Sequence, residues 1–311
     1  MSVSVQNSRG LVARALDSDI FHSFKKSRLT VVAAFITFLF FAGALFAPWI
    51  SPQNPFDPAS LSLLDSYTPP VWQAGGSWQY VLGTDDQGRD ILSTLLYGSR
   101  ISIAVGLASV AFAAVLGIGL GLIAGYFGGR TDAIIMRIAD IQLTFPSILI
   151  ALLIDGSVRS AFDGITRENS AFQILVISIG LSFWVQYART VRSSTLVEKN
   201  KEYIQAARLI GLHPIKIMFR HVLPNVMGPV LVIATINLAL AIILEATLSF
   251  LGVGMPPTQP SLGTMINTGN NFLFSGEWWM VLFPGLYLAV LVLAVNLLGD
   301  WLRDALNPRL R

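Results

Sequence analysis

The chain has 311 residues, of which 53% are apolar and only 13% are charged, whereas soluble globular domains carry roughly 25% charged residues. The apolar residues occur in long runs, so the sequence predicts an integral membrane protein rather than a water-soluble enzyme. The net charge of +3 and the lack of a basic tail argue against a nucleic-acid partner. The absence of cysteine excludes disulfides, thiolate zinc sites and cysteine nucleophiles.

Six stretches are long enough to cross a bilayer, whose core of about 30 Å needs about 20 helical residues. The first stretch follows basic residues, as in a signal peptide, but its apolar run is longer than the apolar region of a signal peptide, which has roughly 7 to 15 residues. We therefore expect an uncleaved first span and an all-α polytopic membrane protein. The predicted spans are residues 29–50, 101–127, 133–154, 171–191, 226–253 and 279–298.

The distribution of Lys and Arg predicts the orientation, because positive residues near span ends tend to stay in the cytoplasm. Sixteen of the 21 fall on one side of the predicted spans and four on the other, with Arg137 inside the third span. Both termini are therefore expected in the cytoplasm. The predicted organisation is a cytoplasmic tail (1–28), a first span (29–50), a periplasmic segment (51–100), a five-helix region (101–300) with a cytoplasmic loop (192–225), and a cytoplasmic tail (301–311).

Two outward segments are longer than simple turns. The first, rich in Pro and Gly, contains Asp85, Asp86 and Asp90. It lacks the alternating ligands and distant Glu of an EF-hand, so we expect no metal site but a turn and an interfacial helix capped by Asp90. The second, residues 252–277, contains three prolines and no Lys or Arg. It either folds back over the outward mouth of a pathway or forms a plain loop.

The cytoplasmic loop between the fourth and fifth spans predicts two short helices joined by a glycine turn. Strong helix formers from Glu202 onward precede Gly211, a suitable C-terminal cap. Pro214 suits the first turn of a second helix, which residues 223–225 are expected to stop. Such an element either docks in a groove of a partner protein or lies on the bilayer as an amphipathic surface.

This loop resembles the EAA loop of permease subunits of bacterial ABC importers. In that pattern Glu-Ala-Ala is followed after three residues by Gly, and nine residues later by Ile, any residue and Leu-Pro. All spacings match, with Gln205 in place of Glu and His221 in place of Ile. The matching residues are Gln205-Ala206-Ala207, Gly211 and Leu223-Pro224, and the two alanines would give a small, smooth docking surface.

Further motifs are similar to those of one subfamily, the dipeptide/oligopeptide ABC importer permeases of the C-subunit type. The similarity covers nearly everything after Lys25. The residues that carry it are Gly83-Thr84-Asp85, Gly88-Arg89-Asp90, Gly125-Tyr126-Phe127-Gly128-Gly129, Asn296-Leu297-Leu298-Gly299-Asp300 and Leu302-Arg303-Asp304-Ala305-Leu306-Asn307-Pro308.

The resemblance implies a non-catalytic subunit of the bacterial inner membrane that forms half of a heterodimeric peptide pore. Implied partners are a second permease, one or two ATPase subunits that bind ATP and Mg, a periplasmic binding protein, peptide and membrane lipid, with no cofactor in this chain. No Lys follows a Gly, so a phosphate-binding P-loop is absent. The residues implied to couple to the ATPase are Tyr203, Gln205, Ala206, Ala207, Gly211, Leu223 and Pro224.

Small and charged residues inside the spans are the remaining candidates. Gly117, Gly121 and Gly125 recur every four residues, a spacing that allows close helix packing within the chain or between subunits. Glu245 and Asp140 are tentative residues of the translocation path, because charges inside a membrane are costly. A structural hydrogen bond is the alternative for Glu245, and an ion pair with Arg137, three residues away, is the alternative for Asp140.

Two other functions remain open at this point. In an ion-gradient-driven secondary transporter, Glu245 and Asp140 would be coupling sites, although we find no internal repeat of the kind many such transporters show. A scaffold without transport is the other alternative. The histidines do not have metal-ligand spacing with acidic neighbours, so they do not point to a metal site or catalysis; they are His22, His213 and His221.

Overall fold

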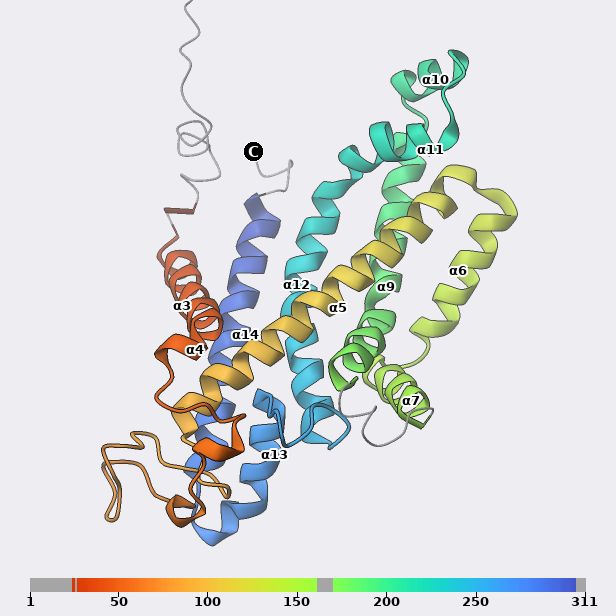
Figure 1. The fold of residues 1–311 in the computed structure, drawn as a ribbon. Coiled ribbons are helices and arrows are strands. Elements are labelled where there is room, and N and C mark those ends of the chain that lie inside the picture. Colours follow the sequence, from red (N-terminus) through yellow and green to blue (C-terminus); the bar gives the residue numbers. More distant parts are fainter. Residues whose placement is uncertain (1–23, 26, 161–169, 306–311) are drawn as a thin grey trace, which may run out of the picture.

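The computed structural model describes residues 24–25, 27–160 and 170–305, and this part of the chain is helical without strands. Most of the predicted N-terminal tail, with His22, and the last six residues of the C-terminal tail lie outside the described residues. Five helical segments are long and apolar enough to cross a bilayer, and they run side by side in Figure 1. They contain α3 (Arg28–Leu45), α5 (Ile91–Phe127), α9 (Ala171–Glu198), α12 (Leu223–Phe250) and α14 (Trp279–Ala305).

The third predicted span is not one straight helix. It consists of α6 (Gly129–Leu143) and α7 (Ser147–Ser160), which are bent by 99° at the short break between them. Pro146 lies in this break; it lacks a backbone N–H and disfavours helical geometry at the preceding residue. The expectation of a continuous helix over 133–154 is therefore wrong, although the bent pair gives a sixth span if it counts as one.

Helix α5 begins earlier than predicted. Asp90 caps it, accepting hydrogen bonds on Oδ2 from the Ser93 backbone N–H (2.8 Å) and hydroxyl (2.6 Å). The helix then continues without a break to Phe127, so the expected interfacial helix and second span are one element. Gly128, with φ of +69°, ends it. The outward segment is correspondingly shorter than residues 51–100.

The most extensive helix contact is between α5 and α9, and the small residues of α5 face it. A Cβ at Gly117 would lie 2.5 Å from the Trp184 carbonyl oxygen, and one at Gly121 would lie 2.6 Å from the Ala188 carbonyl oxygen. At Gly125 the nearest atom, the Thr195 Cβ, would be 2.7 Å away. These separations leave no room for a side chain, so the backbones of α5 and α9 approach directly.

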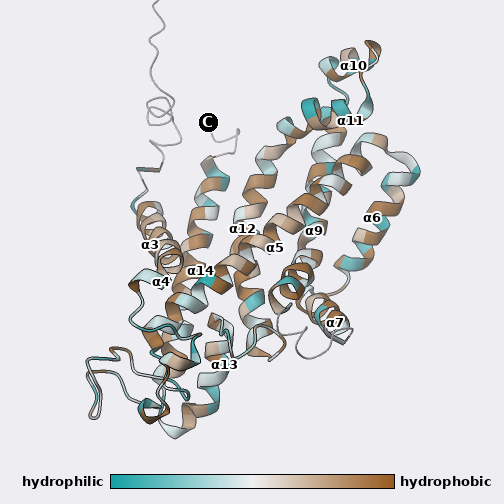
Figure 2. Ribbon diagram, in the orientation of Figure 1, coloured by the Kyte–Doolittle hydropathy of each residue, from teal (hydrophilic) through white to brown (hydrophobic). Residues whose placement is uncertain are grey.

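Two main clusters of buried apolar side chains hold the other helices. One joins α5, α9 and α12, and the other joins α3, the first part of α5, α12, α13 (Leu262–Phe272) and α14. In Figure 2 the long helices are largely apolar, whereas polar residues gather around α11 and in the segment before α5. The shorter elements are α4 (Ala47–Ile50), α10 (Glu202–Leu209), α11 (Pro214–Ile217), a π-helix (Met218–Val222) and 3-10 turns at Pro58–Ser60, Leu63–Asp65 and Leu273–Ser275.

Candidate functional site

The candidate coupling site is the segment 202–222, named here the loop element, which projects beyond the long helices at the α10 and α11 end (Figure 1). Helix α10 ends at Leu209, and Gly211 follows with φ of +77°, which favours glycine. Pro214 begins α11. The predicted helix, glycine turn and helix are therefore present.

The end of the loop element differs from the prediction. Leu223 and Pro224 do not stop the second helix, because the π-helix leads into α12, which begins at Leu223. Pro224 is the second residue of α12 and directly follows the π-helix, so it lies at a change of helix type rather than at a helix end. The loop element is thus continuous with α12, and a displacement of one would be transmitted to the other.

Buried side chains anchor the loop element to the spans. Ile204 and Ala207 of α10 and Ile217 of α11 are buried in the cluster formed by α5, α9 and α12. The expectation that Ala206 and Ala207 together form a docking surface is therefore corrected, because only Ala206 is exposed. The small size of Ala207 lets α10 lie close to the ends of the long helices.

Tyr203 makes a polar anchor at the same place. Its hydroxyl contacts the Glu198 carboxylate and accepts a hydrogen bond from Asn225 Nδ2 at 3.0 Å. Burial and the hydrogen bond to Glu198 raise the pKa of Tyr203 to about 12, so it stays a neutral donor. Tyr203 therefore links α10 to the end of α9 and the start of α12.

An exposed apolar face surrounds these anchors. The side chains of Leu209 and Ile210 are 88% and 75% exposed. Ile215 and Phe219 of the following helices are also exposed, as are Gln205 and Ala206. Apolar side chains clustered outside a core indicate a surface that another molecule covers. The resemblance had not pointed to these four residues. In the sequence, Leu209 and Ile210 directly precede Gly211, and Ile215 and Phe219 follow Pro214.

Glu245, a tentative path residue, is fully buried. Its Oε1 accepts a hydrogen bond from the Ser249 hydroxyl at 2.7 Å, and the side chains of Ser102 and Ser261 lie near the carboxyl group, whose Oε2 has no hydrogen-bond partner among the described residues. Ser249 Oγ in turn accepts from the Met255 backbone N–H at 3.1 Å. The buried carboxyl group therefore lies where α5, α12 and the start of α13 meet, and Glu245 borders no open cavity in this conformation.

Asp140, the second tentative path residue, forms an ion pair with Arg189 of α9. The expected pair with Arg137 on the same helix is therefore wrong. A second bridge between α6 and α9 is bidentate, with Arg192 Nε and Nη2 at 2.5 and 2.6 Å from the two carboxylate oxygens of Asp132. Both pairs fix the start of the broken span to α9, a pairing that spacing along one helix could not reveal.

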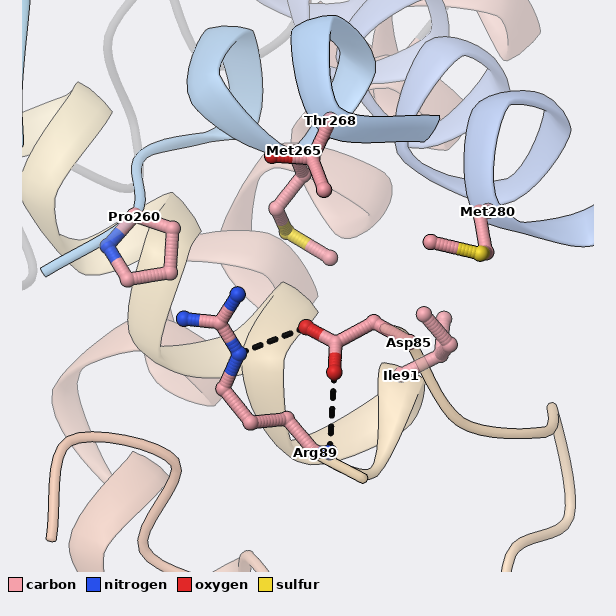
Figure 3. A pocket seen from close by; sticks show the side chains of 7 residues that line it. All are labelled: Asp85, Arg89, Ile91, Pro260, Met265, Thr268 and Met280. Atoms are coloured by element: carbon pink, nitrogen blue, oxygen red, sulfur yellow. Dashed lines mark hydrogen bonds and ion pairs between the residues drawn. The ribbon is translucent and has the colours of Figure 1, made fainter. Parts of the chain in front are cut away.

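The aspartates before α5 form internal ties. Asp85 Oδ2 lies 2.5 Å from Arg89 Nε, and Arg89 Nη1 donates to the Pro257 carbonyl at 2.9 Å. In Figure 3 Asp85 and Arg89 point toward each other below Met265 of α13, around a cavity of about 10 Å³, room for one water molecule at most. Burial and neighbouring Asp85 raise the pKa of Asp86. Among the described residues, no cluster of three or more His or acidic side chains could hold a metal ion.

This arrangement also settles the second outward segment. Residues 252–277 contain α13, which packs against α12 and α14 at the end of the spans opposite the loop element (Figure 1). A Cβ at Gly263 would lie 2.2 Å from the Ala246 carbonyl oxygen, so α13 and α12 meet backbone to backbone. The segment is therefore a packed helix and not a plain loop.

Comparison with known proteins identifies this architecture. Residues 117–311 match the family described as binding-protein-dependent transport system inner membrane component, and residues 18–70 match the N-terminal TM domain of oligopeptide transport permease C. The chain is 42% identical over 293 residues to the dipeptide transport system permease protein DppC of Escherichia coli K12, covering 94% of this chain and 93% of that one. It is 41% identical to the di/tripeptide transport system permease protein DppC of Pseudomonas aeruginosa, covering 86% and 84%.

A solved structure agrees in fold. A chain of the MetNI methionine ABC transporter in an inward-facing conformation aligns with a TM-score of 0.52 at 21% identity, over 69% of this chain and 96% of that one. The fold is thus that of an ABC importer permease. With the family match over most of its length, the chain belongs to the binding-protein-dependent transport system inner membrane components.

Proposed function

We propose that this chain is a membrane-spanning subunit of an ATP-driven importer of peptides. The relatives at about 40% identity over most of the chain are dipeptide and di/tripeptide permeases. Peptide is therefore the best-supported substrate class, and an external binding protein would deliver it. The comparisons give no support to the ion-gradient-driven alternative.

The single observation that carries the coupling role is the exposed apolar face on a rigidly anchored loop element. The side chains of Leu209 and Ile210 are exposed, while those of Ile204 and Ala207 are buried in the core. A partner that grips the outer face would move α12 directly, because the loop element continues into that helix. ATPase subunits are the partners that the proposal assigns to this face, and closure around ATP and Mg would occur in those subunits.

A second, similar permease would complete the pore, with one or two types of ATPase at the loop element. Both termini would lie in the bacterial cytoplasm on the side of the loop element, as the distribution of positive residues indicates. The proposal places no cofactor in this chain.

For Glu245 we infer a positioning role. Its hydrogen bond from Ser249, whose Oγ in turn accepts from the Met255 backbone N–H, favours holding the segment before α13 over direct contact with peptide in this conformation. Asp140, half-exposed and paired with Arg189, is available to a path that opens between α6 and α9. Glu245→Gln should leave uptake unchanged for peptides of different length, whereas a path role predicts a change that depends on length.

The experiment that tests coupling replaces Gly211 by Trp. Gly252 is the matched control, because it also has positive φ (+80°, against +77° at Gly211) and open space around its Cβ, but it lies at the opposite end of the chain's spans. Both variants carry similar backbone strain. Gly211→Trp should abolish peptide-stimulated ATP hydrolysis and uptake in reconstituted vesicles, while Gly252→Trp should retain ATPase binding. Full stimulation in Gly211→Trp would remove the support for coupling at the loop element.

A further inference from the structure

An apolar groove of about 440 Å³ lies between the first span and α5. Its volume is within the roughly 300–1,000 Å³ of small-molecule sites. Phe38 and Phe46 of the first span segment and Leu107 of α5 are among its walls, and all of its lining residues except Arg100 are apolar. The groove therefore suits a hydrocarbon ligand with one anionic end.

The direction of the groove follows from the antiparallel helices. Along α3 the chain passes Phe38 before it reaches Phe46 near the outward end, whereas along α5 it passes Arg100 before Leu107. Arg100 and Phe46 thus mark the outward end of the groove, and Phe38 and Leu107 mark its deeper end. Eight residues of helix from Phe38 to Phe46 correspond to about 12 Å along the groove.

Arg100 occupies the position where a charged ligand end would lie. Its side chain is exposed, and none of the ion pairs within residues 24–25, 27–160 and 170–305 involves it. Trp49, 78% exposed just beyond the outer end of α3, is typical of a membrane interface. A guanidinium at that level meets lipid phosphates, with which it forms bidentate hydrogen bonds.

A second groove of about 380 Å³ lies on the other side of α5. Arg100 and Ala104, one helical turn apart, line both grooves, whereas Ile101 lines only the second and Ile103 only the first. Arg100 therefore stands on a ridge between two grooves. This arrangement matches a molecule with one phosphate and two hydrocarbon chains.

We propose that the chain holds a structural glycerophospholipid of the outward leaflet at Arg100. The phosphate binds the guanidinium, one acyl chain occupies the groove between α3 and α5, and the other follows the second groove. The lipid fills the space beside the first span and thereby ties that span to α5. This site depends only on membrane insertion and not on the identity of the transported substrate.

The test is native mass spectrometry of the whole transport complex, extracted from its membrane in mild detergent and washed to remove loosely held lipid. The variants are Arg100→Gln and Phe38→Ala. Phe35→Ala is the matched control, because Phe35 is exposed on the same helix to a similar extent (61%, against 68% for Phe38) but does not line the groove. Thermal unfolding of each complex checks that the variants remain folded.

Wild type and Phe35→Ala should retain a phospholipid that Arg100→Gln loses and Phe38→Ala holds less well. Arg100→Lys, which keeps the charge, should restore part of the retention. Equal lipid retention in wild type and Arg100→Gln would overturn the proposal, as would the absence of retained lipid in wild type. Because the chain has no cysteine, Phe38→Cys provides a further test with a single reactive thiol. Cross-linking of this thiol to the second permease, instead of labelling by a photoreactive phospholipid, would show that the protein partner fills the groove. That result would refute the lipid site.

Discussion

Replacing Gly121 by Ala tests the direct contact between α5 and α9. The new Cβ would lie 2.6 Å from the Ala188 carbonyl oxygen and 2.9 Å from the Val191 Cβ, whereas ordinary contact begins at 3.4 Å. The helices must therefore separate by about 0.8 Å at this point. Overpacking of this kind costs about 1–3 kcal/mol, and the higher helix propensity of Ala offsets up to about 1 kcal/mol of that cost.

Gly119 supplies the control within the same helix. No atom lies within 4 Å of a Cβ built at Gly119, so Gly119→Ala should be neutral or stabilising by up to about 1 kcal/mol. Thermal unfolding of the two purified variants in the same detergent measures the difference. A Gly121→Ala protein as stable as Gly119→Ala would refute the inference that these helices touch through the glycine stripe.

Three further predictions concern both ends of the molecule. Arg89→Met should lower the free energy of unfolding by about 3–5 kcal/mol, because it leaves Asp85 buried and unpaired, and Asp85→Asn in the same chain should recover part of this loss in thermal unfolding. Asp90→Ala should cost about 1 kcal/mol through loss of the helix cap. Since burial raises the pKa of Asp90, the folded state binds a proton at this side chain more readily than the unfolded state does. Wild type should therefore gain stability as the pH falls through that raised pKa, and Asp90→Asn, which keeps an acceptor, should show less of this gain. Leu209→Ser should change unfolding by less than about 0.5 kcal/mol yet weaken ATPase binding in a pull-down; unaltered binding would contradict the docking face.

Hydrophobic runs were sufficient to predict the all-α membrane fold, because each span must satisfy its backbone hydrogen bonds internally. These runs did not locate the breaks within helices or the residues at which helices begin. Pro146 lies within an apolar run, and run length alone hides the bend there. Conversely, Pro224 looked like a helix end but lies where the π-helix passes into α12. Counting apolar residues also misses a helix start that a polar cap sets, such as Asp90 before α5.

Side-chain roles in the candidate site were harder to predict, because they depend on neighbours from distant helices. The position of Gly211 followed from local chemistry, since a helix end with positive φ favours glycine. Ala207 could not be distinguished from Ala206 without knowing which face of α10 meets the spans. The partner of Asp140 is 49 residues away along the chain, beyond any rule based on helical spacing.

The most direct test of the central claim is to tag this chain in its native membrane, extract it in mild detergent and identify what co-purifies in stoichiometric amounts. The account predicts a second permease and an ATPase with a phosphate-binding P-loop, and predicts that Gly211→Trp loses the ATPase but keeps the permease. Recovery of the chain alone, or as a homodimer without an ATPase in the presence of nucleotide, would contradict it.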